Sequence, residues 1–325
     1  MTSDRITILD GGMGKELYRM GAPFRQSEWS ALALMEAPDL VADAHRNFVS
    51  AGAEVITTNT YALVPYHIGW ERFDREGAKL AEVAASIART VADETAAGGR
   101  SVMVSGSLPP LFGSYQPARF EPDRAPDLWR TLITPQIPHV DVWIGETMSC
   151  VDECRVLAQT LANVTNKPLW AAFTLADRLD EAGRPVLRSG EPLSAVADLI
   201  TELAGRAESM GSGTGSAAVS IEAVLFNCSQ PEVMEPALRE LGPLLPEVRF
   251  GAYANAFDHG DSGHRREDDE ANSIVMERRS DLTPDAYADT AGGWVLAGAS
   301  IIGGCCDIYP EHIAELAHRF ANART

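Results

Sequence analysis

The chain has 325 residues, of which 45% are hydrophobic and 22% are charged, and its formal net charge is -19. This composition is typical of a globular protein large enough for one barrel or two medium domains. The acidic balance argues against nucleic acid or an anionic membrane surface as a partner. No apolar run reaches the roughly 20 residues that span a bilayer, and the first residues lack the apolar segment of a signal peptide. We therefore expect a cytoplasmic protein.

Short apolar or β-branched runs alternate with helical patterns along the chain. Strands are predicted at residues 5–9, 54–58, 101–104, 140–144, 168–173, 218–226, 249–253 and 299–302. Helices are predicted at residues 38–51, 72–95, 127–136, 151–161, 193–208, 231–241, 284–297 and 310–321. Eight evenly spaced strand units predict one α/β domain over residues 1–325, a single (β/α)8 TIM barrel. An open doubly wound sheet would not need eight such even repeats.

Two polar segments interrupt this pattern. Residues 211–216 are rich in glycine, but a helix precedes them and a strand follows. That order is the reverse of a phosphate-binding loop, so we interpret the segment as a flexible connection. Residues 258–272 are rich in charge and glycine, and we expect them to form a mobile lid.

The cysteines are few and odd in number: Cys150, Cys154, Cys228, Cys305 and Cys306. Such a set in a long cytosolic chain does not predict a disulfide framework. Cys305 and Cys306 follow two glycines at the end of the strand 299–302. Neighbouring side chains on a regular strand point to opposite faces, whereas glycine lets the backbone turn both sulfurs toward one point. Paired thiolates of this kind select a soft metal ion such as zinc or copper(I).

A third sulfur is expected from the strand 218–226, which ends at Cys228. The active site of a (β/α)8 barrel lies at the carboxyl ends of its strands, where Cys228 would meet Cys305 and Cys306. Three thiolates leave one position of a tetrahedral zinc open, as in a catalytic site. Zinc deprotonates a coordinating thiol and has no redox chemistry, which predicts alkyl transfer to a substrate thiol. Three unrelated buried cysteines or a vicinal disulfide are the less favoured alternatives.

Carboxylates and turn amides at other strand ends suit an amino-acid substrate. Asp10 and Glu146 follow strands and would receive an α-ammonium group. The N–H groups of Gly11, Gly12 and Met13 would hold an α-carboxylate. Two structural alternatives stay open: Asp10 as a turn-stabilising aspartate and Glu146 as a carboxylate at a helix entry.

Five segments together resemble the homocysteine S-methyltransferase family over essentially the whole chain. They are residues 9–14 (LDGGMG), 58–61 (TNTY), 146–147 (ET), 227–228 (NC) and 303–306 (GGCC). The resemblance implies that Cys228, Cys305 and Cys306 bind Zn²⁺. It also implies that Asp10 and Glu146 hold the homocysteine amino group, that Gly11 and Gly12 hold the carboxylate, and that Met13 and Asn59 lie in the substrate site. Lys15, Ala254 and Asp307 depart from the family pattern without touching a ligand.

The implied reaction is direct displacement. A homocysteine thiolate attacks the methyl group of a sulfonium donor, S-methylmethionine or S-adenosylmethionine, or of a similar donor, and yields methionine. Candidate aromatic side chains for a dry donor site are Trp29, Tyr61, Phe112 and Tyr115. The expected partners are thus small molecules, with the donor and the oligomeric state, monomer or homo-oligomer, left open.

Three other functions are weighed. A zinc hydrolase would use histidine and carboxylate ligands, and none of the seven histidines ends a strand beside the cysteines. A non-catalytic zinc or thiol sensor would bind the metal without turnover. A selenocysteine or selenohomocysteine methyltransferase would use the same site with a selenol acceptor.

Overall fold

The computed structural model of the chain describes residues 5–25, 27–209, 219–257 and 278–321. Two segments singled out in the sequence, the connection at 211–216 and the expected lid at 258–272, lie outside these residues. Among the helices within them, none is both long and apolar enough to cross a membrane.

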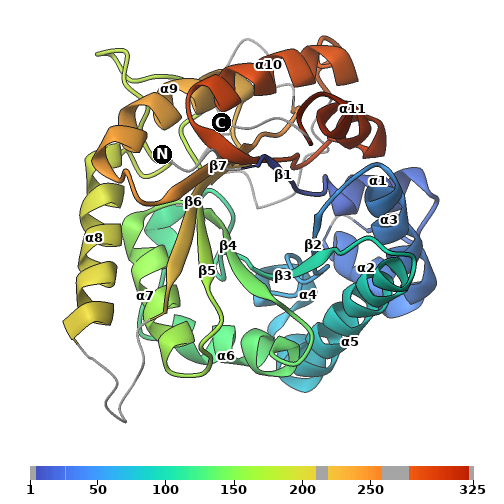
Figure 1. Cartoon of the computed structure of the whole chain (residues 1–325). Coiled ribbons are helices and arrows are strands. Elements are labelled where there is room, and N and C mark those ends of the chain that lie inside the picture. Colours follow the sequence, from blue (N-terminus) through green and yellow to red (C-terminus); the bar gives the residue numbers. More distant parts are fainter. Residues whose placement is uncertain (1–4, 26, 210–218, 258–277, 322–325) are drawn as a thin grey trace.

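Eight parallel strands form one sheet in the described residues, in the order β1-β8-β7-β6-β5-β4-β3-β2. The strands are β1 (Thr7–Ile8), β2 (Val55–Thr57), β3 (Met103–Leu108), β4 (Val142–Met148), β5 (Leu169–Phe173), β6 (Ile221–Asn227), β7 (Arg249–Tyr253) and β8 (Ala299–Ile302). A parallel bridge between Leu9 and Val55 joins the two ends of this sheet. The Asp10 N–H also donates to the Val55 carbonyl at 3.0 Å. The sheet is therefore closed, which confirms the predicted (β/α)8 barrel (Figure 1).

Helices surround the strands, as the view along the barrel in Figure 1 shows. They are α1 (Met13–Arg19), α2 (Ser30–Glu36), α3 (Pro38–Ser50), α4 (Pro65–Ile68), α5 (Trp70–Ala97), α6 (Ala125–Gln136), α7 (Val151–Ala162), α8 (Leu193–Ser209), α9 (Pro231–Leu241), α10 (Pro284–Leu296) and α11 (Pro310–Phe320), with 3-10 turns η1 (Pro117–Arg119) and η2 (Gly242–Leu244). The sequence did not predict α1, α2 and α4, because four to seven residues are too short for a helical repeat to stand out.

Helix α5 illustrates how the sequence positions the outer layer. Its buried side is made largely of alanines, including Ala81, Ala88 and Ala92, together with Phe73 near its start. Small side chains allow the helix to lie close to its neighbours, and the helical spacing keeps them on one face. The helix ends before Gly98 and Gly99, the latter with a φ of 91°. A left-handed residue after a helix terminus is normally glycine, so the helix stops here, two residues beyond the predicted end at residue 95.

Strands β3 and β4 continue beyond the apolar runs that predicted them. Ser105 and Ser107 lie inside β3, and Glu146 lies inside β4. Parallel pairing explains the extension, because Ser107 pairs with Ile144 and the ladder uses backbone groups whatever the side chains are. Glu146, which was predicted to follow its strand, is thus fixed on rigid backbone.

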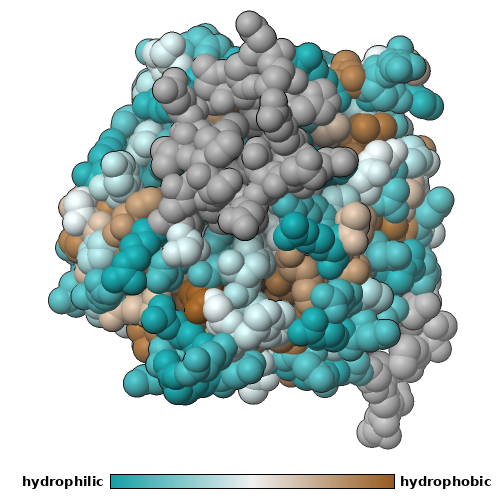
Figure 2. All heavy atoms as spheres, turned by 180° about the vertical axis from the view of Figure 1, so that it is seen from behind, coloured by the Kyte–Doolittle hydropathy of each residue, from teal (hydrophilic) through white to brown (hydrophobic). Residues whose placement is uncertain are grey.

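Two apolar layers support the barrel. The larger layer lies between strands and helices, and it contains Trp129, Trp143, Phe173 and Phe226. The smaller layer fills the barrel interior with side chains from alternate strand positions: Leu9, Val55, Val142, Ile144, Trp170, Ala172, Ala223, Leu225, Tyr253 and Ile301. The outer face in Figure 2 is mostly hydrophilic where it is not grey, with apolar residues in small separate areas.

His45 on α3 gives the fold a testable dependence on pH. The side chain is fully buried, and neither ring nitrogen has a hydrogen-bond partner among the described residues. Desolvation lowers the pKa of His45 from 6.5 to about 4, so the unfolded chain binds a proton more readily than the folded one. The contribution of His45 to the free energy of unfolding is fully present above pH 6.5. It is lost as the pH drops from 6.5 to 4, by about 3 kcal/mol at most.

We expect the variant His45→Met to remove this contribution. Urea unfolding at pH 7, 5.5 and 4.5 measures the free energy of unfolding for both proteins. The wild-type value should fall more steeply than that of the variant, whose side chain is of similar size and does not titrate. Parallel curves would show that His45 is not protonated differently in the two states.

Candidate active site

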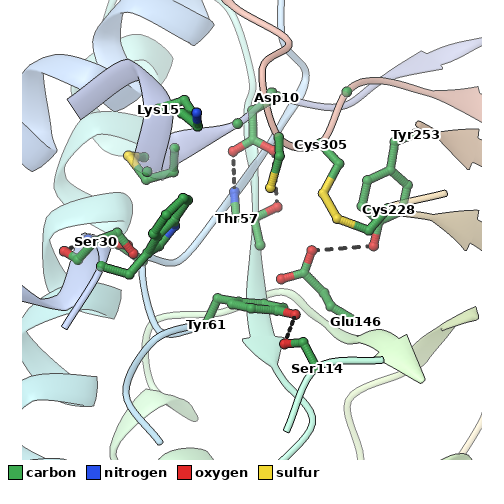
Figure 3. A pocket seen from close by; sticks show the side chains of 18 of the residues that line it. Asp10, Lys15, Ser30, Thr57, Tyr61, Ser114, Glu146, Cys228, Tyr253 and Cys305 are labelled. Carbon is green, nitrogen blue, oxygen red and sulfur yellow. Dashed lines mark hydrogen bonds between the residues drawn. A yellow bond between two sulfur atoms is a disulfide. The ribbon is translucent and has the colours of Figure 1, made fainter. Parts of the chain in front are cut away.

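A cavity lies at the carboxyl ends of the strands, where barrel enzymes hold their active sites (Figure 3). All the substrate-site and metal-site residues predicted from the sequence line this cavity. The residues that line it include Asp10, Gly11, Gly12, Met13, Lys15, Trp29, Thr57, Asn59, Tyr61, Ser114, Tyr115, Glu146, Cys228, Tyr253, Phe257, Gly304, Cys305 and Cys306.

Three sulfurs meet in the wall of this cavity. The Sγ atoms of Cys228, Cys305 and Cys306 all lie within 4.8 Å of one another. Cys228 follows β6 and the other two follow β8, so the strand order places one cysteine on one side of β7 and two on the other. The expected convergence of the three sulfurs is confirmed, whereas their role as metal ligands stays a prediction.

Backbone hydrogen bonds hold the cysteine turn between β1 and β7. The N–H of Gly304 donates to the Asp10 carbonyl at 3.0 Å, and that of Cys305 donates to the Ala254 carbonyl at 2.9 Å. The Cys306 carbonyl accepts from the Ala256 N–H at 3.0 Å. Cys228 itself has a φ of 52°, an uncommon left-handed conformation for a residue other than glycine. Backbone strain of this kind concentrates at functional sites.

Cys228 and Cys305 are joined as a disulfide, with their Cα atoms 5.6 Å apart. The cysteine count did not predict a disulfide framework, and this is the single disulfide bond among the described residues. The two residues are separated by 77 positions in the sequence, and only the barrel order shows that their strand ends are close. Cys306, which is partly exposed, is not part of the bond.

The reduced cluster fits zinc. Sulfurs bound at about 2.3 Å to a tetrahedral zinc lie about 3.8 Å apart, and the three sulfurs here lie within 4.8 Å. Small side-chain rotations would suffice to bring them into that geometry. Metal ligands must be thiolates, so the disulfide and a metal-bound state exclude each other.

Asp10 faces the cavity from the end of β1. Its carboxylate accepts hydrogen bonds from the Thr57 N–H at 2.7 Å and the Thr57 hydroxyl at 3.1 Å. Burial is the main cause that raises the pKa of Asp10 to about 8; the bond from the Thr57 N–H opposes it, and the charge of Glu146 adds to it. These bonds tie Asp10 to β2, 47 positions away, and do not make it the turn-stabilising aspartate considered from the sequence; its contact with a substrate stays a prediction.

Glu146 lies on β4 across the cavity from Asp10 (Figure 3). The Ser107 hydroxyl donates to one of its carboxylate oxygens, and the Tyr253 hydroxyl donates to the other at 3.3 Å. Desolvation raises the pKa of Glu146, against the effect of these two bonds. Because Glu146 belongs to a strand and not to a helix entry, the second structural alternative is wrong. Tyr253, the last residue of β7, was not predicted from the sequence because it belongs to the apolar run that marks the strand.

The remaining predicted substrate residues line the cavity. The Gly12 N–H donates to the Ile308 carbonyl at 2.9 Å in this structure; Gly12 lines the cavity, and its contact with a substrate carboxylate stays a prediction. The side-chain amide of Asn59 donates to the Ser30 carbonyl at 3.1 Å and still lines the cavity. Gly11 and Met13 line it as well, and their contact with a carboxylate stays a prediction.

Aromatic side chains also line the cavity. Trp29, Tyr61 and Tyr115 line it as predicted, and Phe257 does so without having been predicted. The Tyr61 hydroxyl is hydrogen-bonded to Ser114 at 2.7 Å, and burial raises the pKa of Tyr61 well above its usual range. Phe112 does not line this cavity; it lines a second hollow together with Trp70 and Phe120.

A closed parallel barrel with three sulfurs at its carboxyl edge defines a TIM-barrel enzyme with a candidate metal centre. The family model described as homocysteine S-methyltransferase matches residues 7–320. The homocysteine S-methyltransferase of Escherichia coli (strain K12) is 28% identical over 331 residues, covering 97% of this chain and 95% of that protein. The homocysteine S-methyltransferase YbgG of Bacillus subtilis (strain 168) is 24% identical over 333 residues, covering 96% and 93%.

The solved structures agree with this match. The metallated form of the homocysteine methyltransferase MmuM from Escherichia coli superposes with a TM-score of 0.73 at 25% identity, covering 97% of this chain and 96% of that one. The chain belongs to the homocysteine S-methyltransferase family, and it is a methyltransferase.

Proposed function

We propose that this enzyme transfers a methyl group from a sulfonium donor to the thiol of L-homocysteine, with zinc held by Cys228, Cys305 and Cys306. The observation that carries the proposal is the convergence of three sulfurs beside the carboxylates of Asp10, which is buried, and Glu146, which is partly buried, in one cavity. The family match supports the same acceptor. Reduction of the Cys228–Cys305 disulfide precedes metal binding, because zinc requires thiolates.

Cys228, Cys305 and Cys306 would hold zinc, which would supply a deprotonated, nucleophilic substrate thiolate without redox chemistry. In the displacement, a bond forms between the homocysteine sulfur and the methyl carbon. The bond from that carbon to the donor sulfur breaks, and its electron pair leaves with the neutral sulfide. The thiol proton is released to solvent.

The two carboxylates orient the acceptor. Asp10 and Glu146 receive the α-ammonium group of homocysteine, and this positive charge allows both carboxylates to ionise despite their burial. Thr57 fixes Asp10, while Ser107 and Tyr253 fix Glu146. Preorganised partners keep the carboxylates in place, so the substrate sulfur meets the cysteine cluster in one orientation.

The aromatic side of the cavity suits the donor. A sulfonium loses its charge as the methyl group transfers, so an environment with little water favours the reaction. Trp29, Tyr61 and Tyr115 exclude water there, and their ring faces attract a cation. The chemistry is that of a cytoplasmic enzyme with small-molecule partners, since it requires reduced thiols.

The direct test combines zinc content with methionine formation. The protein is reduced with a phosphine, loaded with zinc, and supplied with homocysteine and S-methylmethionine, S-adenosylmethionine or betaine in turn. One zinc per chain and methionine from at least one donor are expected. Stoichiometric zinc without methylation by any donor would favour the sensor function, and faster turnover with a selenol acceptor would favour the selenocysteine alternative.

A further inference from the structure

Lys15 brings a positive charge into the cavity. It lies in the first turn of α1, and among the described residues that line the cavity it is the only lysine or arginine. His67 also lines it, but burial lowers the pKa of His67 to about 4, so that ring is neutral at pH 7. The Lys15 side chain is 13% exposed, which is unusually low for a lysine. A lysine kept this far from water beside an active site calls for a charged partner.

Asp307 is one such partner, but it does not use all the hydrogen-bond donors of the Lys15 ammonium group. The Lys15 Nζ lies 3.4 Å from the Asp307 Oδ2, longer than the about 2.7–2.9 Å of a strong charge-assisted hydrogen bond. Asp307 is held in turn by the Tyr309 hydroxyl, which donates to its Oδ1 at 3.0 Å. An ammonium group has three donors, and a single carboxylate oxygen at this distance does not use them all.

The charges in the cavity are therefore arranged in two regions. Asp10 and Glu146 form the acidic region, and Lys15 lies on the other side of Asp10 from Glu146 in Figure 3. An α-amino acid carries a cation and an anion on neighbouring atoms, so it matches such a pair of regions. The Gly12 N–H is already bound to Ile308 in this structure.

We propose that Lys15 is a specificity-determining residue that binds the α-carboxylate of the acceptor amino acid. This inference rests on the proposed function. It adds the group that selects an amino acid over a thiol without a carboxylate. Asp307 keeps the lysine side chain directed at the cavity edge, and the carboxylate of the substrate takes the remaining donors of the ammonium group.

Binding measurements separate this role from the reaction itself. Calorimetry with the reduced, zinc-loaded enzyme measures the affinities of homocysteine and of 3-aminopropane-1-thiol, which is homocysteine without its carboxylate. The variant Lys15→Met keeps the length of the side chain and removes the charge. We expect it to bind homocysteine about 10- to 100-fold more weakly, as a lost charge-assisted hydrogen bond implies. Its affinity for the aminothiol should not change.

Lys79→Met is the matched control, because Lys79 is exposed on α5 and does not line the cavity. It should bind both thiols as the wild type does. Equal weakening of both thiols in Lys15→Met would overturn the proposal by showing a general structural role, and so would unchanged binding of both. Methionine formation by the wild type is scored separately. Its absence would contradict the proposed function while the binding comparison still decides the role of Lys15.

Discussion

Replacing Cys306 by alanine is expected to abolish zinc retention and to lower methionine formation more than about 100-fold. Loss of an outer-shell partner of a metal already costs about 10- to 100-fold, and this substitution removes one of three proposed ligands. Metal content after dialysis and kcat/KM for homocysteine measure the two effects under reducing conditions.

Cys150→Ala is the matched control for this prediction. Cys150 lies directly before α7 and is not part of the three-sulfur cluster. Burial raises the pKa of its thiol to about 12, so it remains protonated and does not ligate a metal at neutral pH. This variant should retain zinc and activity. If Cys306→Ala retains both as well, the ligand assignment is wrong.

The second large effect is expected from Gly303→Ala. A Cβ at Gly303 would lie 2.5 Å from the Cβ of Leu9 and 3.0 Å from the Asp10 carbonyl oxygen. Neither neighbour moves easily, because Leu9 fills the barrel interior and the Asp10 carbonyl accepts the Gly304 N–H. We expect a loss of about 1–3 kcal/mol in the free energy of unfolding, as overpacking typically causes. The cysteine turn should shift at the same time and weaken zinc binding.

Gly205→Ala on α8 controls for the change of residue type. A Cβ at Gly205 would meet no atom within 4 Å, and alanine in a helix interior gains about 0.5–1 kcal/mol over glycine. Chemical denaturation should therefore show an equal or slightly higher free energy of unfolding for this variant, and a zinc competition titration should show an unchanged zinc affinity. An undiminished stability and zinc affinity in Gly303→Ala would show that the turn has more space than its contacts indicate.

Much of the fold could be predicted because helical and strand periods are local properties. β7, β8 and α9 have the predicted bounds, since turn residues mark their ends. The errors occur where local signals compete with tertiary contacts. β3 and β4 extend through polar residues because their neighbours supply hydrogen bonds, and the short α1, α2 and α4 form where helical repeats are too few to detect.

The residue types of the candidate site, and the convergence of Cys228 with Cys305 and Cys306 at the strand ends, could be predicted from the sequence. Cys305 and Cys306 beside two glycines indicate metal chemistry in the sequence alone, and carboxylates at strand ends indicate an amino-acid substrate. The hydrogen bonds that fix these groups were not predictable. Tyr253 reaches Glu146 across 107 positions, and Thr57 reaches Asp10 across 47.

The sequence by itself determined the barrel, the family and the set of sulfurs, because each can be inferred from short patterns of neighbouring residues. Tertiary structure alone decided how those groups are used. Closure of β1 against β2 and the order β6-β7-β8 bring Cys228 to Cys305. The pairing of Lys15 with Asp307, 292 residues later, was decided in the same way. Side chains far apart in a chain interact only after the barrel closes, and burial then sets their charges and partners.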